Sequence, residues 1–99
     1  MNPVETVTGN IDTAAHPVIG GGFRLQWEPA QQAHVLLYPE GMVKLNQSAG
    51  AILTRCDGLL TVADIVADLE RTYSAAGLTR DVCAFIALAV ERTWLELRP

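Results

Sequence analysis

The sequence predicts an α+β fold in which a three-stranded antiparallel sheet is followed by three helices. Two observations predict this order. Apolar and polar residues alternate in short runs between residues 23 and 46, which is typical of half-buried strands. Beyond residue 49, apolar residues recur every three or four positions, which is typical of amphipathic helices. The connections between these segments are short, so we expect one domain.

The composition and charge limit which kinds of protein this chain can be. Of the 99 residues, 49% are hydrophobic and 18% charged, which allows a modest core without a metal or a disulfide. The net charge is −4, and only seven residues are Lys or Arg. Nucleic acid and anionic membrane surfaces are therefore disfavoured as partners. No run reaches the roughly 20 apolar residues of a membrane span, and the N-terminus carries no secretory signal pattern. Two cysteines without a CxxC spacing indicate a reduced, cytoplasmic protein.

Residues 1–22 are expected to form a flexible N-terminal arm. They show no sustained periodicity and end in three consecutive glycines, which predict a hinge. A disordered tail without a function is the simpler alternative for a chain terminus. The ordered domain is expected to span residues 23–99.

Three strands are predicted in the first half of the chain. The segment FRLQWE, residues 23–28, alternates and ends before Pro29, and HVLLY forms the second strand over residues 34–38. The PEG motif that follows predicts a three-residue hairpin loop with Gly41 at a positive φ.

This loop fixes an expected register for the third strand, residues 42–46. It places Tyr38 opposite Met42 and puts four apolar residues on one face, which should be the core face. These four residues are Val35, Leu37, Val43 and Leu45.

Three helices follow, each with a start or stop signal. Asn46 or Ser48 should cap the first helix, over residues 49–56, and Gly58 should end it in the left-handed conformation. Thr61 and Asp64 match a capping box for the second helix. The apolar face of this second helix is Val62, Ile65, Val66, Leu69 and Tyr73.

The third helix is expected over residues 80–97, with Thr79 as its N-cap. One apolar stripe can cover the core and consists of Val82, Ile86, Ala89, Val90 and Thr93. A second stripe, rotated toward the flank, consists of Phe85, Leu88 and Leu95. A helix that is apolar over so much of its girth is either deeply buried or contacts a partner.

Three strands followed by three helices are typical of a winged helix-turn-helix-like fold. That fold alone would propose binding to DNA. The charges on the third helix argue against it, because three arginines are matched by three carboxylates. These are Arg80, Arg92 and Arg98 against Asp81, Glu91 and Glu96.

No catalytic group or metal site is predicted. The candidate ligands His16, His34, Cys56 and Cys83 do not occur at the spacing of a closed zinc site. Neither cysteine carries a motif that would activate it as a nucleophile. We therefore expect neither an enzyme nor a bound cofactor.

One long segment resembles a known family. LLYPEGMVKLNQSAGAILTRCDG, followed by TVADIVADL, resembles the PqqD family of pyrroloquinoline quinone biosynthesis, and the similarity runs from about Phe23 to Leu97. The YPEG, LN and CDG motifs are weak alone and specific together. The resemblance implies a recognition element for a ribosomally made peptide. Such a protein binds the precursor peptide PqqA as a peptide chaperone and presents it to the radical-SAM enzyme PqqE.

The resemblance also implies where the peptide binds. Related domains take the peptide as an extra strand beside the third strand and against the third helix. The implied peptide-binding residues are Met42, Val43, Lys44, Leu45 and Asn46 on the strand, and Phe85, Leu88, Ala89 and Arg92 on the helix.

The residues themselves favour the same place, because an unpaired strand edge is a template for another strand. The sequence leaves open whether Val43 and Leu45 or Lys44 and Asn46 turn their backbone groups to the free edge. It also leaves alternatives: a different ribosomally made peptide as cargo, a winged-helix DNA-binding regulator, and a homodimer formed through the same edge.

Overall fold

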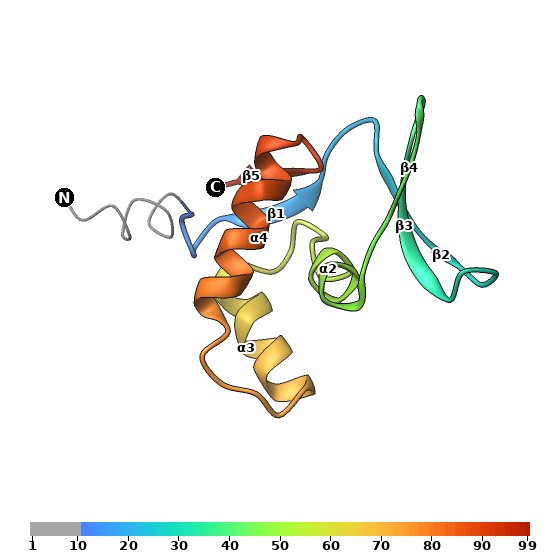
Figure 1. The fold of residues 1–99 in the computed structure, drawn as a ribbon. Coiled ribbons are helices and arrows are strands. Elements are labelled where there is room, and N and C mark those ends of the chain that lie inside the picture. Colours follow the sequence, from blue (N-terminus) through green and yellow to red (C-terminus); the bar gives the residue numbers. More distant parts are fainter. Residues whose placement is uncertain (1–10) are drawn as a thin grey trace.

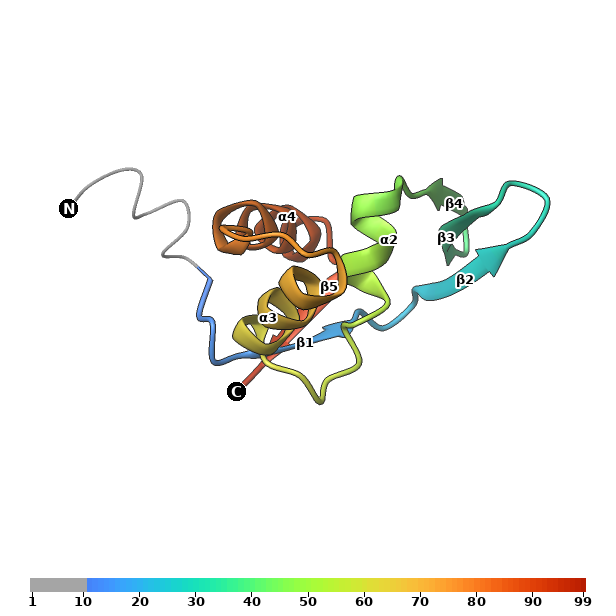
Figure 2. The ribbon, with the colours of Figure 1, turned by 90° about the horizontal axis from the view of Figure 1, so that it is seen from below.

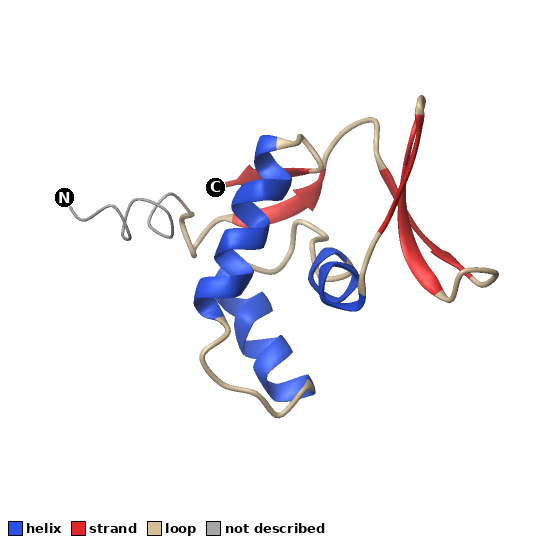
Figure 3. Cartoon of the chain, in the orientation of Figure 1, coloured by secondary structure: helices blue, strands red, loops and turns tan. Residues whose placement is uncertain are grey.

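The computed structural model describes residues 11–99 and contains two small sheets and a group of helices (Figures 1 and 3). The elements, in chain order, are β1 (His16–Ile19), β2 (Arg24–Glu28), β3 (Ala33–Tyr38), β4 (Gly41–Lys44), α2 (Gln47–Leu53), α3 (Val62–Thr72), α4 (Thr79–Glu91) and β5 (Leu95–Arg98). The strand order is β2-β3-β4 in one sheet and β1-β5 in the other. The predicted α+β fold, a three-stranded antiparallel sheet followed by three helices, is confirmed. The second sheet was not predicted.

The three-stranded sheet lies at one end of the domain and the helices α3 and α4 at the other, with α2 between them in both views (Figures 1 and 2). The core joins these parts. Its largest fully buried side chains include Leu36 from the sheet, Leu53 from α2, Ile65 from α3 and Ile86 from α4. The sheet is therefore attached to the helices through α2.

The two-stranded sheet brings the N-terminal segment into the fold. β1 pairs antiparallel with β5, from His16 opposite Arg98 to Ile19 opposite Leu95. Ile11 and Ala15 are also buried. Residues 11–22 are thus part of the fold, which corrects the expected domain start at residue 23. The rest of the expected arm, residues 1–10, lies outside the described residues.

A proline in β1 fits this pairing. The Gly20 N–H donates to the Trp94 carbonyl (2.7 Å), so bonded and non-bonded pairs alternate from there and Pro17 falls in a non-bonded pair. Its missing N–H removes no ladder bond to β5. The Pro17 carbonyl turns the other way and accepts from the Gly58 N–H (2.9 Å), which ties β1 to the loop after α2.

The third helix is shorter than predicted. α4 ends at Glu91 rather than at residue 97, because Thr93 adopts a left-handed φ of 63° and turns the chain back. Leu95, assigned to a helix stripe, lies instead in β5 and is 2% exposed. The predicted N-cap, Thr79, is also wrong. The N-cap is Leu78, which makes no side-chain capping bond, and its N–H is bound by the Glu70 carboxylate (2.9 Å).

The β3–β4 hairpin differs from the prediction by one residue. Tyr38 pairs with Gly41, so the loop contains only Pro39 and Glu40, and Gly41 does not have a positive φ. Neither Pro39 nor Glu40 has a positive φ, so the loop is not one of the primed turns that usually close two-residue hairpins. Proline suits the first central position of an unprimed turn, and this is the case that the motif did not indicate.

This shift by one residue changes which β3 side chains share a face with each β4 side chain. Leu36 now lies opposite Val43 and is 0% exposed within the core, whereas Leu37 lies opposite Met42 on the outer face. The predicted core face is therefore right for Val43 and Leu45 and wrong for Leu37. Val35 is buried as well, although it shares the outer face with Leu37.

The predicted helix starts in the middle of the chain are confirmed. Asn46 is the N-cap of α2 and its side chain accepts from the Ala49 N–H (2.8 Å). Thr61 and Asp64 form the complete capping box of α3. Gly58 has the predicted left-handed φ (+83°), but it does not end the helix: α2 runs from Gln47 to Leu53, with Thr54 as its C-cap, and Gly58 lies in the loop beyond.

Two glycines provide a test of the turn assignments. Gly58→Ala should lower the free energy of unfolding by about 1 kcal/mol, because a β-carbon is strained at its positive φ. Gly41→Ala should be nearly neutral, since the added carbon would lie in ordinary contact with the Tyr38 ring (3.5 Å to the hydroxyl oxygen). Urea unfolding of both variants measures this difference. Equal losses would contradict the two-residue loop.

A carboxylate joins the loop after α2 to α3. Asp68 accepts from the Arg55 Nε (2.6 Å) and from the Arg71 guanidinium (2.7 Å). The hydrogen bond from Arg55 is the main cause that lowers the pKa of Asp68, and the hydrogen bonds of the capping box lower the pKa of Asp64.

These shifts predict acid sensitivity. A carboxylate whose pKa is lower in the folded state stabilises the fold at pH values above its unfolded pKa of about 3.9. This contribution is lost as the pH falls through the pKa of the folded state. The urea concentration at the midpoint of unfolding should therefore decrease as the pH is lowered below about 4. Asp68→Asn should be less stable than the parent at pH 7, with a difference that shrinks on acidification. A difference that stays constant with pH would rule out the ion pairs as its cause.

Candidate functional site

The outer edge of β4 is open. β4 is the last strand in the order β2-β3-β4, and no strand among residues 11–99 pairs with its other side. An open edge presents N–H and C=O groups that another extended chain can pair with.

The hydrogen bonds of the hairpin decide which residues face this edge. The Leu45 N–H donates to the His34 carbonyl (3.0 Å). Inward and outward residues alternate along an antiparallel strand, so Val43 and Leu45 turn their backbone groups toward β3. Met42 and Lys44 turn theirs outward. The choice that the sequence left open is thus resolved in favour of Lys44.

Asn46 contributes less to the edge than Lys44. Its carbonyl accepts from the Gly50 N–H (2.9 Å), and its side chain caps α2. Among the strand residues implied by the resemblance, Leu45 is buried in the core and Val43 is half-buried. The side chains free to meet a ligand are those of Met42, which is 47% exposed, and Lys44.

The outward face of α4 carries a row of four residues at helical spacing: Asp81, Phe85, Leu88 and Arg92. Phe85 is partly buried, Leu88 is 39% exposed, and Arg92 is exposed with its guanidinium 5.4 Å from the Trp94 ring centroid. Ala89 is 0% exposed and belongs to the core. Of the implied helix residues, three are therefore accessible and Ala89 is not.

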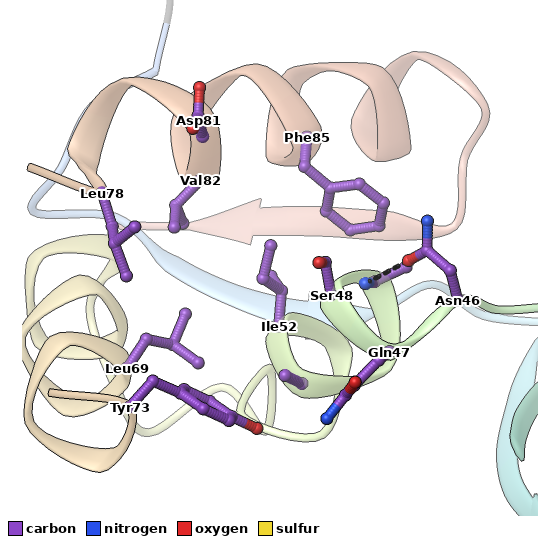
Figure 4. A pocket seen from close by; sticks show the side chains of 12 residues that line it. Asn46, Gln47, Ser48, Ile52, Leu69, Tyr73, Leu78, Asp81, Val82 and Phe85 are labelled. Carbon is purple, nitrogen blue, oxygen red and sulfur yellow. Dashed lines mark hydrogen bonds between the residues drawn. The ribbon is translucent and has the colours of Figure 1, made fainter. Parts of the chain in front are cut away.

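A groove of about 480 Å³ lies where the start of α2, the end of α3 and the first half of α4 meet (Figure 4). Phe85 points from α4 toward the start of α2, where Asn46 and Ser48 stand at the rim. The apolar side chains of Ile52 and Leu69 also line the groove. Because Asn46 is the second residue beyond the end of β4, the groove adjoins one end of the open edge.

The sequence missed several lining residues of this groove: Gln47, Ser48, Tyr73, Leu78 and Asp81. They come from different elements and meet only through tertiary packing. The helical periodicity predicts Tyr73 on the apolar face of the second helix, but it is the C-cap of α3 and is half exposed. Its position at the end of the periodic pattern was the one local signal for this role.

The cysteines are poor nucleophiles. Burial raises the pKa of the Cys56 thiol to about 12, with a smaller contribution from the charge of Asp57, and burial also raises the pKa of Cys83. Both cysteines are free. Within residues 11–99, no three His, Cys, Asp or Glu side chains are grouped so that they could hold a metal ion. No helix in the same range is long and apolar enough to cross a membrane.

Comparison with known families identifies the chain. The family model described as coenzyme PQQ synthesis protein D (PqqD) matches residues 33–95, which is more than half of the chain and includes β4, α2 and α4. The chain belongs to the PqqD family. The resemblance found in the sequence is thus confirmed.

Members of the PqqD family are similar over most of the chain. A PqqA binding protein of Stutzerimonas stutzeri is 60% identical, covering 83% of this chain and 90% of its own length. A PqqA binding protein of Azotobacter vinelandii is 57% identical, covering 82% and 89%. Both names describe binding to PqqA.

A solved PqqD structure supports the fold. The solution NMR structure of the PqqD truncation of Methylobacterium extorquens PqqCD superposes with a TM-score of 0.71 at 30% identity, covering 87% of this chain and 94% of that one. That protein is described as a functional, stand-alone recognition element for ribosomally synthesised and modified peptides.

Proposed function

We propose that this PqqD-family protein binds the precursor peptide PqqA as an added strand on the outer edge of β4. The observation that carries the proposal is the open edge at Met42 and Lys44, beside the groove that Phe85 lines. The relatives named PqqA binding protein, up to 60% identical over most of the chain, support PqqA as the cargo.

Affinity in this arrangement comes from the main chain. Met42 and Lys44 together offer two N–H and two C=O groups, and each hydrogen bond contributes about 0.5–1.5 kcal/mol. Main-chain bonds do not distinguish one peptide from another, so selectivity comes from side chains along the path. Phe85 and Leu88 on α4 offer apolar contacts for this purpose.

The bound peptide is presented and not altered. The two thiols are buried with raised pKa values. The exposed side chains of Met42, Lys44 and Asn46 at the edge carry a thioether, an amine and an amide. The chemistry then belongs to a second protein, the radical-SAM enzyme PqqE, which receives the peptide from this protein. We place this hand-over in the cytoplasm, where the two free cysteines would stay reduced.

Titration with synthetic PqqA, followed by the backbone amide signals of the labelled protein, tests the proposal. The amides of Met42 and Lys44 should shift strongly and become protected from hydrogen exchange, while the mass of the peptide stays unchanged. Shifts confined to other elements, or a covalent change in the peptide, would contradict it. Adding PqqE to the complex should yield a ternary assembly.

The same edge can pair two copies of the protein. PqqA and a second copy would then compete for Met42 and Lys44. Sedimentation at rising protein concentration, with and without PqqA, distinguishes two cases: a dimer that dissociates when the peptide binds, and a monomer that binds the peptide directly.

A further inference from the structure

We infer that Lys44 selects an acidic residue in the bound peptide, flanked on both sides by apolar ones. This inference rests on the proposed strand addition at β4 and specifies which side chains the added strand must carry.

The register places Lys44 on the outer face of the three-stranded sheet. Lys44 lies opposite Val35, which lies opposite Gln26, so these three form one row across the sheet. The neighbouring row is Met42, Leu37 and Arg24. Val43 and Leu45 turn to the opposite face, toward the core.

The outer face is basic, although the chain as a whole carries a charge of −4. Arg24 and Lys44 are the Lys and Arg residues of β2, β3 and β4. The carboxylate on this face, Glu28, lies at the far end of β2 and accepts from the Ala30 N–H (3.3 Å). Ion pairs among the described residues join Asp68 to Arg55 and Arg71, so neither Arg24 nor Lys44 has one there.

Strand addition brings one peptide side chain next to this free ammonium group. The residue directly opposite Lys44 points to the same face, with a Cβ–Cβ distance of about 4.5–5.5 Å, whether the added strand is parallel or antiparallel. Opposite charges in such a pair attract, and like charges repel.

The two neighbours of that peptide residue point the other way. They lie beside Val43 and Leu45, on the side of the sheet that faces the core and the helices. Successive side chains of a strand point to opposite faces. The peptide residue opposite Lys44 should therefore be acidic, and the residues before and after it should be apolar.

A charge exchange tests the pair. The probes are synthetic PqqA and variants in which each acidic residue is changed singly to Lys, titrated against the parent protein and Lys44→Glu. At one position, Lys in the peptide should weaken binding to the parent by about threefold to tenfold, and Lys44→Glu should restore it. The effect should shrink in 1 M salt, where screening is strong.

Two further variants control for indirect effects. Arg24→Glu changes the charge of the same face two strands away from the edge and should rescue no peptide variant. Lys44→Gln should bind the parent peptide and its Lys variant almost equally. Thermal melting confirms that each protein variant is folded.

The results distinguish a failure of the Lys44 pairing from a failure of the proposed binding to PqqA. If the parent binds PqqA and Lys44→Glu rescues no position, the inference is overturned while strand addition stands. If the parent does not bind PqqA at all, the proposed function fails and the inference fails with it.

Discussion

Gly20→Ala should strongly destabilise the domain, whereas Gly21→Ala should leave it nearly unchanged. A β-carbon on Gly20 would lie 2.2 Å from the backbone carbonyl oxygen of Thr93, which cannot move aside like a flexible side chain. Gly20 is buried, and its N–H donates to the Trp94 carbonyl where β1 meets β5. The expected loss is at least about 1–3 kcal/mol, which is typical of an overpacked site.

Gly21 is a matched control in the same glycine triplet. A β-carbon there would have the Glu96 carboxylate as its nearest neighbour, at 4.0 Å. Urea unfolding of both variants measures the difference. Equal stability of the two would show that the N-terminal segment does not lie against residues 93 and 94, as it would if residues 11–22 formed a free arm.

Val43→Pro is the second change with a large expected effect. Val43 lies opposite Leu36 in a hydrogen-bonded pair, so proline removes a ladder donor and leaves a buried carbonyl without its partner. The expected loss is on the order of 3 kcal/mol, a large part of the total stability of a small domain.

Val43→Ala separates the two contributions to this loss. It removes the half-buried side chain but keeps the N–H, so it should be clearly less destabilising than Val43→Pro. Thermal melting of both variants is the measurement. If Val43→Pro melts like Val43→Ala, Val43 does not face β3, and the assignment of the edge residues is reversed.

Much of the fold could be predicted from short stretches of neighbouring residues. The capping residues Asn46, Thr61 and Asp64 were predictable because a helix start depends on a few neighbouring side chains. The strand periodicity of the hairpin was predictable for the same reason. Its register was not, because YPEG fits two loops that differ by one residue.

Non-local pairing accounts for the rest. β1 and β5 have four residues each and lie at opposite ends of the chain, so neither has a clear pattern without the other. The segment after Arg92 continues a helical spacing of apolar residues, and only the turn at Thr93 redirects it into a strand. The groove residues come together from α2, α3 and α4, which no local pattern reveals.

In the proposed complex, the peptide pairs with the outward backbone groups of β4. Lys44→Pro removes one of these groups without disturbing the sheet, because the Lys44 N–H points away from β3 and makes no bond in the hairpin. Lys44→Ala is the matched control, since it also lacks the ammonium group but keeps the N–H. We expect both variants to melt close to the parent, and Lys44→Pro to bind PqqA several times more weakly than Lys44→Ala. Equal binding by the two folded variants would contradict strand addition at this edge.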